Sequence, residues 1–335
     1  DPIEDMLNFM TSLKSKGFTS DLLRQKHGFT NNAEINRTTG LISLHVDNAI
    51  RLSEQGLNGS AQIAFLPLYY STLNFLKVYL LFLGKRTELE RNRWHGAKYS
   101  ESEMTRQFLN ERIVIAERGT IPLAYRLLTG KAIPRIGVKI TLEEIYSTIS
   151  SIAAEYKTIA NKQSNLIAHQ IHLIEDPQNG HHFKLTILDN YHRANPPLAR
   201  QLKAFSRIRL VQSANNSPHY VSVKMQGNFN TIKPRLLNLI NRNLISDCLI
   251  NSAQNNQWLT YSPVNGRAHV IPEELSILIA YFHLSNVIRY NPEHLDKLMD
   301  SKYWAIILGL RKHGFLRFLK LTWGNINKTS FDIEK

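Results

Sequence analysis

Two residues near the end of the chain, Arg289 and His294, have the side chains of an acid–base site for phosphodiesters. Between them, Asn291-Pro292 is typical of a helix N-cap followed by proline at the first helical position, so we expect His294 in the first turn of a helix. A helix N-terminus attracts anions, and an arginine just before it could bind phosphate. The spacing alone is common by chance, so the predicted position at a helix start carries the interpretation.

A second candidate is His95, in the sequence Trp94-His95-Gly96. Arg93 and Lys98 lie in the basic stretch around it. An imidazole in such a loop could bind phosphate or transfer a proton. An exposed loop histidine without a special role explains the pattern equally well, and both interpretations stay open.

Three polar side chains interrupt an otherwise apolar segment. Tyr70, Asn74 and Lys77 are spaced by four and three residues, so they would share one stripe of a helix. An amide and an ammonium group are costly to bury without partners. The stripe therefore predicts either an internal polar network or a surface that faces a ligand.

Basic and aromatic residues alternate near the C-terminus, where Arg311 and Lys312 precede Phe315 and Phe318. A helix with this pattern could contact a nucleic-acid backbone and stack on bases. Phenylalanines at helical spacing are more typical of a core, which would leave only the basic side exposed to solvent.

Metal and cofactor sites are not expected. Four histidines flank a predicted hairpin at Asn179-Gly180, but no cysteine or pair of carboxylates completes a ligand set. They are His169, His172, His181 and His182. The sequence also contains no phosphate-binding loop, dinucleotide fingerprint or nucleophile elbow.

Helices should position most of these residues. Apolar spacing predicts helices from Pro2 to Gly17 and from Val46 to Gln55, and the latter could pack as a hairpin against the apolar segment Phe65 to Leu83. Further helices are expected at 103–117, from a capping box at Thr141 to Glu144 up to about Asn161, and at 232–243, 272–288 and 293–323. We expect a polar connection at 30–40 and a loop at 85–102.

The middle of the chain has a different pattern. Short apolar runs separated by turn residues predict a β-rich module, and a short strand is expected around Trp258 to Tyr261. The predicted fold class is mainly α with a β-rich insertion, an α+β protein. Its parts are an N-terminal helix and connection (1–40), the first part of a helical core (41–164), the β-rich module (165–231) and a C-terminal helical part that completes the core (232–335).

The net charge of +14 favours a polyanionic partner, with RNA first, although basic residues can also serve solubility alone. The single cysteine, Cys248, favours a reducing compartment, and no secretory signal is visible, so we expect a cytoplasmic protein. The first residue is Asp1, which leaves open whether residues precede it. Pro67, Asn74 and Lys77 interrupt the longest apolar run, so we expect a core helix and no membrane span.

Several stretches together resemble the YaaC-like family of bacterial proteins. The resemblance rests, in chain order, on residues 46–55, Pro67-Leu68-Tyr69-Tyr70-Ser71-Thr72-Leu73-Asn74-Phe75-Leu76-Lys77, His95-Gly96, Gly119, Thr141-Leu142-Glu143-Glu144-Ile145, Arg289-Tyr290-x-Pro292 and Ser301-Lys302-Tyr303. It spans most of the chain.

The first helices of that family are similar to the HEPN superfamily, in which tyrosine-rich helices and a later arginine and histidine form a site, often across a dimer. Many HEPN proteins are metal-independent ribonucleases of toxin and phage-defence systems, and others have lost catalysis. The resemblance implies a HEPN-like helical core in which Arg289 stabilises phosphate and His294 acts as general acid or base. Tyr290 and Pro292 depart from the pattern common in HEPN nucleases.

We therefore expect a homodimer that binds or cleaves RNA, and the resemblance implies a role in a bacterial defence or stress system. Two alternatives remain open. One is a non-catalytic scaffold that binds another protein through Tyr70, Asn74, Lys77 and His95. The other is a protein that binds a nucleotide-like anion in its helical core.

Overall fold

The computed structural model describes residues 1–327, except for 92–93, 101, 104–105, 163–165, 189–207, 214–215, 223, 237–248, 252–257 and 262–270. The chain forms two compact units. The helical unit contains Asp1–Arg126, Lys131–Lys162 and Glu273–Thr329, and the sheet unit is built mainly on Gln163–Pro272. The protein is mostly helical with two small antiparallel sheets, which confirms the predicted α+β class.

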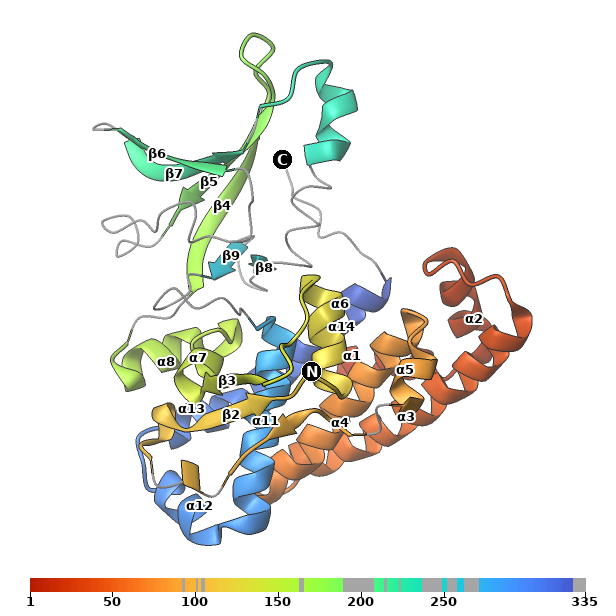
Figure 1. Cartoon of the computed structure of the whole chain (residues 1–335), viewed down its shortest axis with the longest axis vertical. Helices are drawn as coiled ribbons and strands as arrows, with labels where there is room; N and C mark the ends of the chain where they lie inside the picture. The colour runs from red at the N-terminus through yellow and green to blue at the C-terminus, as the bar shows by residue number, and fades with distance from the viewer. Residues whose placement is uncertain are drawn as a thin grey trace. The chain divides into compact units, whose positions relative to one another are not determined.

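Two long helices dominate the first part of the helical unit (Figure 1). They form an antiparallel hairpin, as the sequence predicted, in which Ser71 Oγ donates a hydrogen bond of 2.7 Å to the carbonyl of Ala49. Gly56 permits this close approach, because a Cβ there would lie 2.5 Å from Cγ of Leu68. The first helices are α1 (Pro2–Ser12), α2 (Lys16–Gln25), α3 (Asn32–Asn58), α4 (Ala61–Phe82) and α5 (Arg86–Arg91).

Apolar residues cover most of α4 apart from the stripe of Tyr70, Asn74 and Lys77, so most of the helix is buried and needs several helices around it. Its neighbours include α3, α11 and α14. No helix in the described part of the chain combines the length and apolar character that crossing a membrane requires.

Two predictions for the N-terminal part are wrong. Gly17 does not end the first helix: α1 stops at Ser12, and Gly17 lies inside α2. The predicted polar connection at 30–40 is mostly the beginning of α3, where the Asn31 side chain accepts hydrogen bonds from the first backbone amides. Most of its polar residues are exposed on one face of this helix, although Thr38 and Thr39 are buried, and such a polar run resembles a loop in composition.

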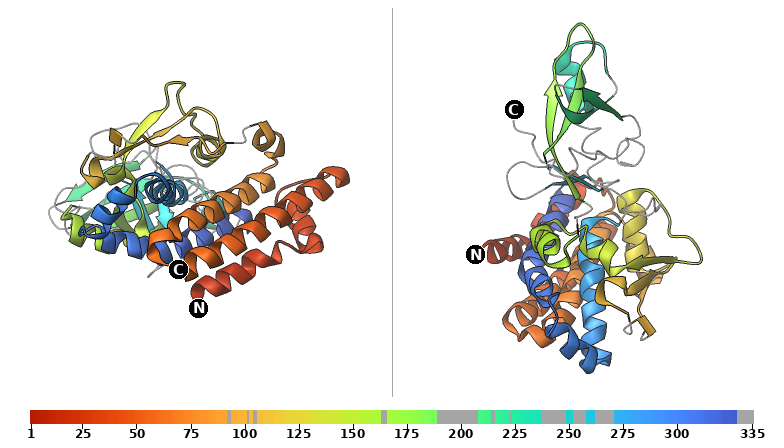
Figure 2. Two further views of the ribbon diagram at one scale, coloured as in Figure 1. Left: turned by 90° about the horizontal axis from the view of Figure 1, so that it is seen from below. Right: turned by 90° about the vertical axis from the view of Figure 1, so that its left-hand side faces the viewer.

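A three-stranded antiparallel sheet lies on one side of α11 (Figure 2). The prediction of a helix at 103–117 is wrong, because the described part of this segment forms a 3-10 turn followed by β2. Ile113 and Ile115 alternate with less buried residues and pair with β3. The elements here are β1 (Ala97–Lys98), η2 (Phe108–Asn110), β2 (Arg112–Ile115), α6 (Thr120–Thr129) and β3 (Val138–Thr141).

The capping box after β3 is confirmed. The Thr141 side chain accepts from the Glu144 amide, and the Glu144 carboxylate accepts from the Thr141 amide. The helix that follows is shorter than predicted, since three short elements fill the range up to Asn161. They are α7 (Leu142–Tyr146), η3 (Ser150–Ile152) and α8 (Ala153–Ala160).

The C-terminal part begins with α11, the helix predicted at 272–288. The long helix predicted at 293–323 is instead divided into four pieces, one of which is a π-helical turn with its wider hydrogen-bond ring. The elements are α11 (Glu273–Tyr290), α12 (Pro292–Met299), α13 (Trp304–Gly309), the π-helical turn η6 (Leu310–Gly314) and α14 (Phe315–Asn327).

In the described part of the sheet unit, six antiparallel strands lie in the order β6-β7-β5-β4-β9-β8. The sheet extends past the boundary that the sequence suggested at 231, because β8 and β9 add to the edge of β4. The short strand predicted at Trp258 to Tyr261 is confirmed as β9. The strands are β4 (Leu166–Ile174), β5 (His182–Ile187), β6 (Ile208–Ser213), β7 (Asn216–Ser222), β8 (Leu249–Asn251) and β9 (Trp258–Tyr261).

Candidate functional site

A buried carboxylate lies at the centre of the most concentrated polar cluster. Glu111, between η2 and β2, is 0% exposed and accepts hydrogen bonds from three side chains. His283 Nε2 donates at 2.8 Å, His294 Nε2 at 3.0 Å, and the Tyr99 hydroxyl makes the third bond. We call these four residues the carboxylate cluster.

The environment of Glu111 keeps it ionised. Burial raises the pKa of this carboxyl, but the hydrogen bonds from His283, His294 and Tyr99, together with the charge of His283, outweigh burial and bring the pKa down to about 2. Burial and the carboxylate raise the pKa of Tyr99, so its hydroxyl keeps the proton that it donates. Glu111 is therefore an acceptor that fixes the orientation of both imidazole rings.

His294 connects this buried cluster to the surface, because its side chain remains 13% exposed. The Asn291 side chain caps α12 by accepting from the His294 amide at 2.9 Å, and Pro292 occupies the first helical position, so the predicted helix start is confirmed. Since Nε2 of His294 donates to Glu111, Nδ1 is the ring nitrogen left for a proton from outside.

Arg289 belongs to a second group of contacts, which we call the tyrosine cluster: Tyr69, Tyr70, His95, Phe282 and Arg289. Its guanidinium lies 3.5 Å from the Tyr70 hydroxyl. The His95 ring contacts Phe282, with centroids 4.8 Å apart, and Tyr69 contacts His95, Tyr70 and Phe282. Burial lowers the pKa of His95, and the Arg289 charge lowers it further.

The two clusters are neighbours in the fold. Consecutive residues of α11 belong to them: Phe282 is part of the tyrosine cluster, and His283 is part of the carboxylate cluster. Arg289 is exposed near the end of the same helix, and His294 follows in the first turn of α12. The structure thus brings the predicted pair to adjacent groups of aromatic and titratable side chains.

Two glycines hold the loop that carries His95. A Cβ on Gly119 would lie 2.5 Å from the Gly96 Cα, and one on Gly96 would lie 2.5 Å from Cδ of Pro122. Both glycines have a positive φ, which a side chain would strain. The close contact lets the carbonyls of Trp94 and His95 accept from the amides of Thr120 and Ile121.

The polar stripe of α4 forms an internal network over part of its length. Asn74 Oδ1 bonds to His45 Nδ1 at 2.8 Å, and Asn74 Nδ2 donates to the Tyr70 carbonyl. Burial lowers the pKa of both His45 and Lys77, and the charge of Lys77 lowers that of His45 further. Tyr70, at the other end of the stripe, is 39% exposed and reaches Arg289.

The remaining predicted anion-binding residues that the structure describes belong to neither cluster, although Lys98 directly precedes Tyr99 in the chain. Arg311 caps the end of α3, since its guanidinium donates to the carbonyls of Gly56, Leu57 and Gly59, so these donors are occupied in a structural contact. Lys98 and Lys312 are exposed. Arg93 lies outside the described residues.

The aromatic residues near the C-terminus belong to the core, as the second interpretation of that stretch held. Phe315 and Phe318 are fully buried. Between them, Arg317 is also buried and forms an ion pair of 2.8 Å with Glu273. This helix face is therefore not available for stacking on bases.

Two of the four histidines that flank the predicted hairpin, His181 and His182, make hydrogen bonds to the backbone, and His172 is exposed. His181 Nε2 bonds to the carbonyl of Gly227, and its Nδ1 accepts from the Asp176 amide. His182 Nδ1 lies 3.1 Å from the Gly180 carbonyl. Within the described ranges, no three histidine, cysteine, aspartate or glutamate side chains are arranged to hold a metal ion.

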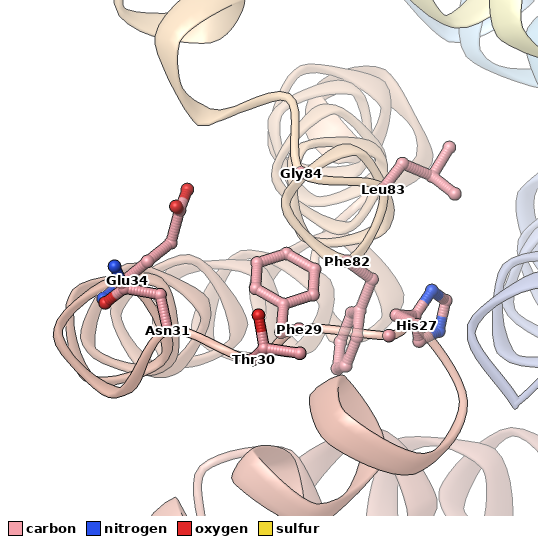
Figure 3. A pocket seen from close by; sticks show the side chains of 9 residues that line it. His27, Phe29, Thr30, Asn31, Glu34, Phe82, Leu83 and Gly84 are labelled. Carbon is pink, nitrogen blue, oxygen red and sulfur yellow. The ribbon is translucent and has the colours of Figure 1, made fainter.

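A pocket of about 470 Å³ opens between the α2–α3 connection and the end of α4 (Figure 3). The rings of Phe29 and Phe82 lie in its middle, with His27 on one side and Glu34 on the other. The His27 ring is held by the Ile326 carbonyl at 2.6 Å. None of the residues that the sequence singled out lines this pocket.

Sequence reasoning missed Glu111, Tyr99 and His283. Glu111 lies in a segment predicted as a helix, where a glutamate suggests an exposed face. His283 did give a signal, because it is a titratable residue in the middle of the apolar run of α11. A buried histidine there requires a polar partner, although the sequence does not say which one.

The separate stretches that carried the family resemblance meet around these clusters. Gly96 contacts Gly119, the Leu142 amide donates to the Glu111 carbonyl at 2.9 Å, and the Tyr303 ring packs on Phe108 beside Glu111. A family model described as YaaC-like Protein matches residues 11–311. No curated protein and no solved structure matches the chain.

Proposed function

Because this chain belongs to the YaaC-like family, we propose that its two adjacent clusters form a HEPN-like site that binds RNA and cleaves it without a metal ion. The observation that carries the proposal is the hydrogen bond between buried Glu111 and partly exposed His294. A carboxylate that orients an imidazole and stabilises its protonated form is the arrangement of a general base.

In the proposed reaction, His294 Nδ1 takes the proton of a ribose 2′-hydroxyl. The 2′-oxygen then attacks the adjacent phosphorus, and the bond to the 5′-oxygen of the next nucleotide breaks. That oxygen takes a proton from solvent. The products are a 2′,3′-cyclic phosphate and a 5′-hydroxyl, and Glu111 stabilises the imidazolium that forms on His294.

Arg289 would bind the phosphate that gains negative charge in this step. Its guanidinium is exposed and held by the Ser285 carbonyl and the Tyr70 hydroxyl, at 3.1 and 3.5 Å. A positioned cation stabilises charge that develops on a phosphoryl oxygen. The net charge of +14 supports a polyanionic substrate. A dimer and a role in bacterial defence or stress are parts of the same proposal that rest on the resemblance.

The second candidate is a non-catalytic member of the same fold that binds RNA or another protein. One observation favours it: Glu111 and His283 are both completely buried, which is also expected of a polar network that only stabilises the core. In that case His294 would complete the hydrogen bonds of Glu111 without touching a substrate.

The test is incubation of the purified protein with mixed cellular RNA in the presence of a chelator. We expect cleavage to fall roughly 100-fold or more in His294→Ala, because a general base contributes about that much. Arg289→Ala should also lose most of the activity. RNA with 2′-O-methyl groups should stay intact, because it lacks the attacking hydroxyl.

Matched controls are His313→Ala and Arg37→Ala, which remove an exposed histidine and an exposed arginine elsewhere. Both should cleave RNA as the unmodified protein does, and circular dichroism should show all variants folded. Intact RNA with the unmodified protein would reject cleavage and leave the non-catalytic candidate.

A further inference from the structure

Three aromatic side chains in contact with Arg289 or with the tyrosine cluster are unusually open to solvent. Tyr70 is 39% exposed, Trp94 41% and Tyr290 61%. Large aromatic residues normally bury most of their surface, so several exposed ones in one region indicate a contact surface. We call Tyr70, Trp94, Arg289 and Tyr290 the aromatic strip.

The strip is joined by a continuous series of contacts. The Arg289 guanidinium lies over the Tyr290 ring, 4.9 Å from its centroid, and also reaches the Tyr70 hydroxyl. Tyr70 contacts Tyr69, Tyr69 contacts His95, and the His95 ring is 6.3 Å from that of Trp94. None of these side chains carries a negative charge.

The Trp94 end of the strip is held by backbone contacts that do not involve its indole. The Trp94 carbonyl accepts from the Thr120 amide at 3.1 Å, and the next carbonyl accepts from Ile121 at 2.9 Å. The indole can therefore be removed or changed without removing the bonds that place the loop. The fixed backbone lowers the entropy cost of placing the indole against a flat ligand.

We propose that the aromatic strip binds unpaired bases of single-stranded nucleic acid, with Arg289 on a phosphate between them. The proposal rests on the nucleic-acid partner of the proposed function and specifies how that partner is held. Exposed aromatic rings stack on any base, and a cation among them pairs with the backbone. Stacked bases in a duplex cannot offer their faces, so single strands should bind better than duplexes.

The experiment measures binding of a fluorescein-labelled single-stranded DNA dodecamer by fluorescence anisotropy. DNA lacks the 2′-hydroxyl and cannot be cleaved by the proposed route, so binding is tested independently of catalysis. We expect Trp94→Ala to weaken binding about tenfold, because the variant loses the ring on which one base stacks. Trp94→Phe should restore most of the affinity.

Two controls separate stacking from charge and folding. A strand of abasic sites keeps its phosphates but has no bases to stack. It should therefore bind weakly, and with the same affinity, to the unmodified protein and to Trp94→Ala. Phe18→Ala removes another exposed aromatic side chain, 40% exposed on α2, and should bind as the unmodified protein does.

An unchanged affinity in Trp94→Ala, or equal binding of abasic and base-bearing strands, would overturn the proposal. Equal binding of a duplex would do the same. Because none of these results depends on cleavage, RNA hydrolysis with a failed stacking test would reject only the aromatic strip. Stacking without hydrolysis would reject only the reaction.

Discussion

At the scale of single residues, Glu111 shows how the cost of burying a charge is offset by its neighbours. Three donors converge on one carboxylate that has no contact with solvent. In the unfolded chain these donors disperse, and the carboxyl regains its ordinary pKa of about 4.5. Part of the stability of the protein should therefore depend on pH.

The first prediction concerns Glu111→Gln. The folded-state pKa of about 2 lies below the ordinary value, so the stabilisation is present above about pH 4.5 and is lost as the pH falls toward 2. The shift corresponds to roughly 3 kcal/mol. Urea unfolding measures the free energy of unfolding at pH 7 and at pH 3. Between these pH values the unmodified protein should lose much of this free energy, and Glu111→Gln should lose less.

The control is Glu54→Gln, which changes an exposed carboxylate on α3 in the same way. It should lose as much stability between pH 7 and pH 3 as the unmodified protein. If Glu111→Gln also loses as much stability between pH 7 and pH 3 as the unmodified protein, the carboxylate cluster does not cause this pH dependence.

A second prediction concerns His95, whose pKa is lowered by burial and by the Arg289 charge. Removing the charge in Arg289→Ala favours the protonated ring, so the pKa of His95 should rise toward its ordinary value without reaching it, since burial remains. NMR titration of the histidine ring protons measures this. His45, whose pKa is lowered by burial and by Lys77, serves as the internal reference and should not change. If the pKa of His95 is unchanged in Arg289→Ala, the charge of Arg289 lies too far from the ring to affect its pKa.

Residue types and local spacing predicted only the part of the site that is local in sequence. Asn291-Pro292 predicted where the helix that contains His294 begins, because a helix cap is formed by residues adjacent in sequence. The bonds from His283 and His294 to Glu111 span 172 and 183 residues. Only the tertiary fold selects such partners, so the carboxylate that orients His294 could not be predicted.

At the scale of elements, the same distinction between local and distant causes applies. The capping box at Thr141 and the hairpin of α3 and α4 were predictable, because neighbouring residues or a long apolar pattern specify them. The segment at 103–117 was not, because β2 exists through its pairing with β3, more than twenty residues later. Pairing across that distance overrides local helical spacing.

A third prediction belongs to the loop that positions His95. Gly119→Ala should destabilise the protein by roughly 2 kcal/mol or more, because it combines a φ of +127° with a Cβ only 2.5 Å from the Gly96 Cα. Thermal unfolding measures the change. RNA binding should weaken as well, since the loop carries Trp94 and His95.

The matched control is Gly40→Ala, in which the added methyl group meets nothing within 4 Å and the position is inside α3. It should stabilise the protein by about 0.5–1 kcal/mol, because alanine favours a helix over glycine. A Gly119→Ala protein as stable as the unmodified one would show that the loop can relax around the extra atom.

At the scale of the whole molecule, the spacing of apolar residues along the chain predicted the class of fold, and the net charge predicted a partner of negative charge. The α+β class is confirmed by the helical unit and the six-stranded sheet. The sequence placed the end of the β-rich part too early, since β8 and β9 join the sheet through pairing with β4 and with each other. Their short apolar runs give little local indication of such a partner.

The fourth prediction is that the logarithm of the RNA-binding constant falls linearly with the logarithm of salt concentration, because binding releases counterions from the phosphates. Lys98→Ala and Lys312→Ala, each of which removes an exposed charge, should lower the slope by about 1 if the lysine contacts a phosphate. Lys14→Ala is the control, because Lys14 is paired with Asp47 at 2.7 Å and should leave the slope unchanged. A slope that no lysine variant alters would exclude these contacts.

The π-helical turn η6 gives the chain between α13 and α14 one residue more than a regular α-helical turn would hold. If the same residues formed an ordinary α-helix instead, the one residue that the wider ring takes up would rotate α14 by roughly 100° about its axis. Phe315 and Phe318 would leave the core, and Arg317 would turn away from Glu273. The wider turn thus acts as a phase correction between two helix faces, because it takes up one residue without turning the buried face of α14 away from the core.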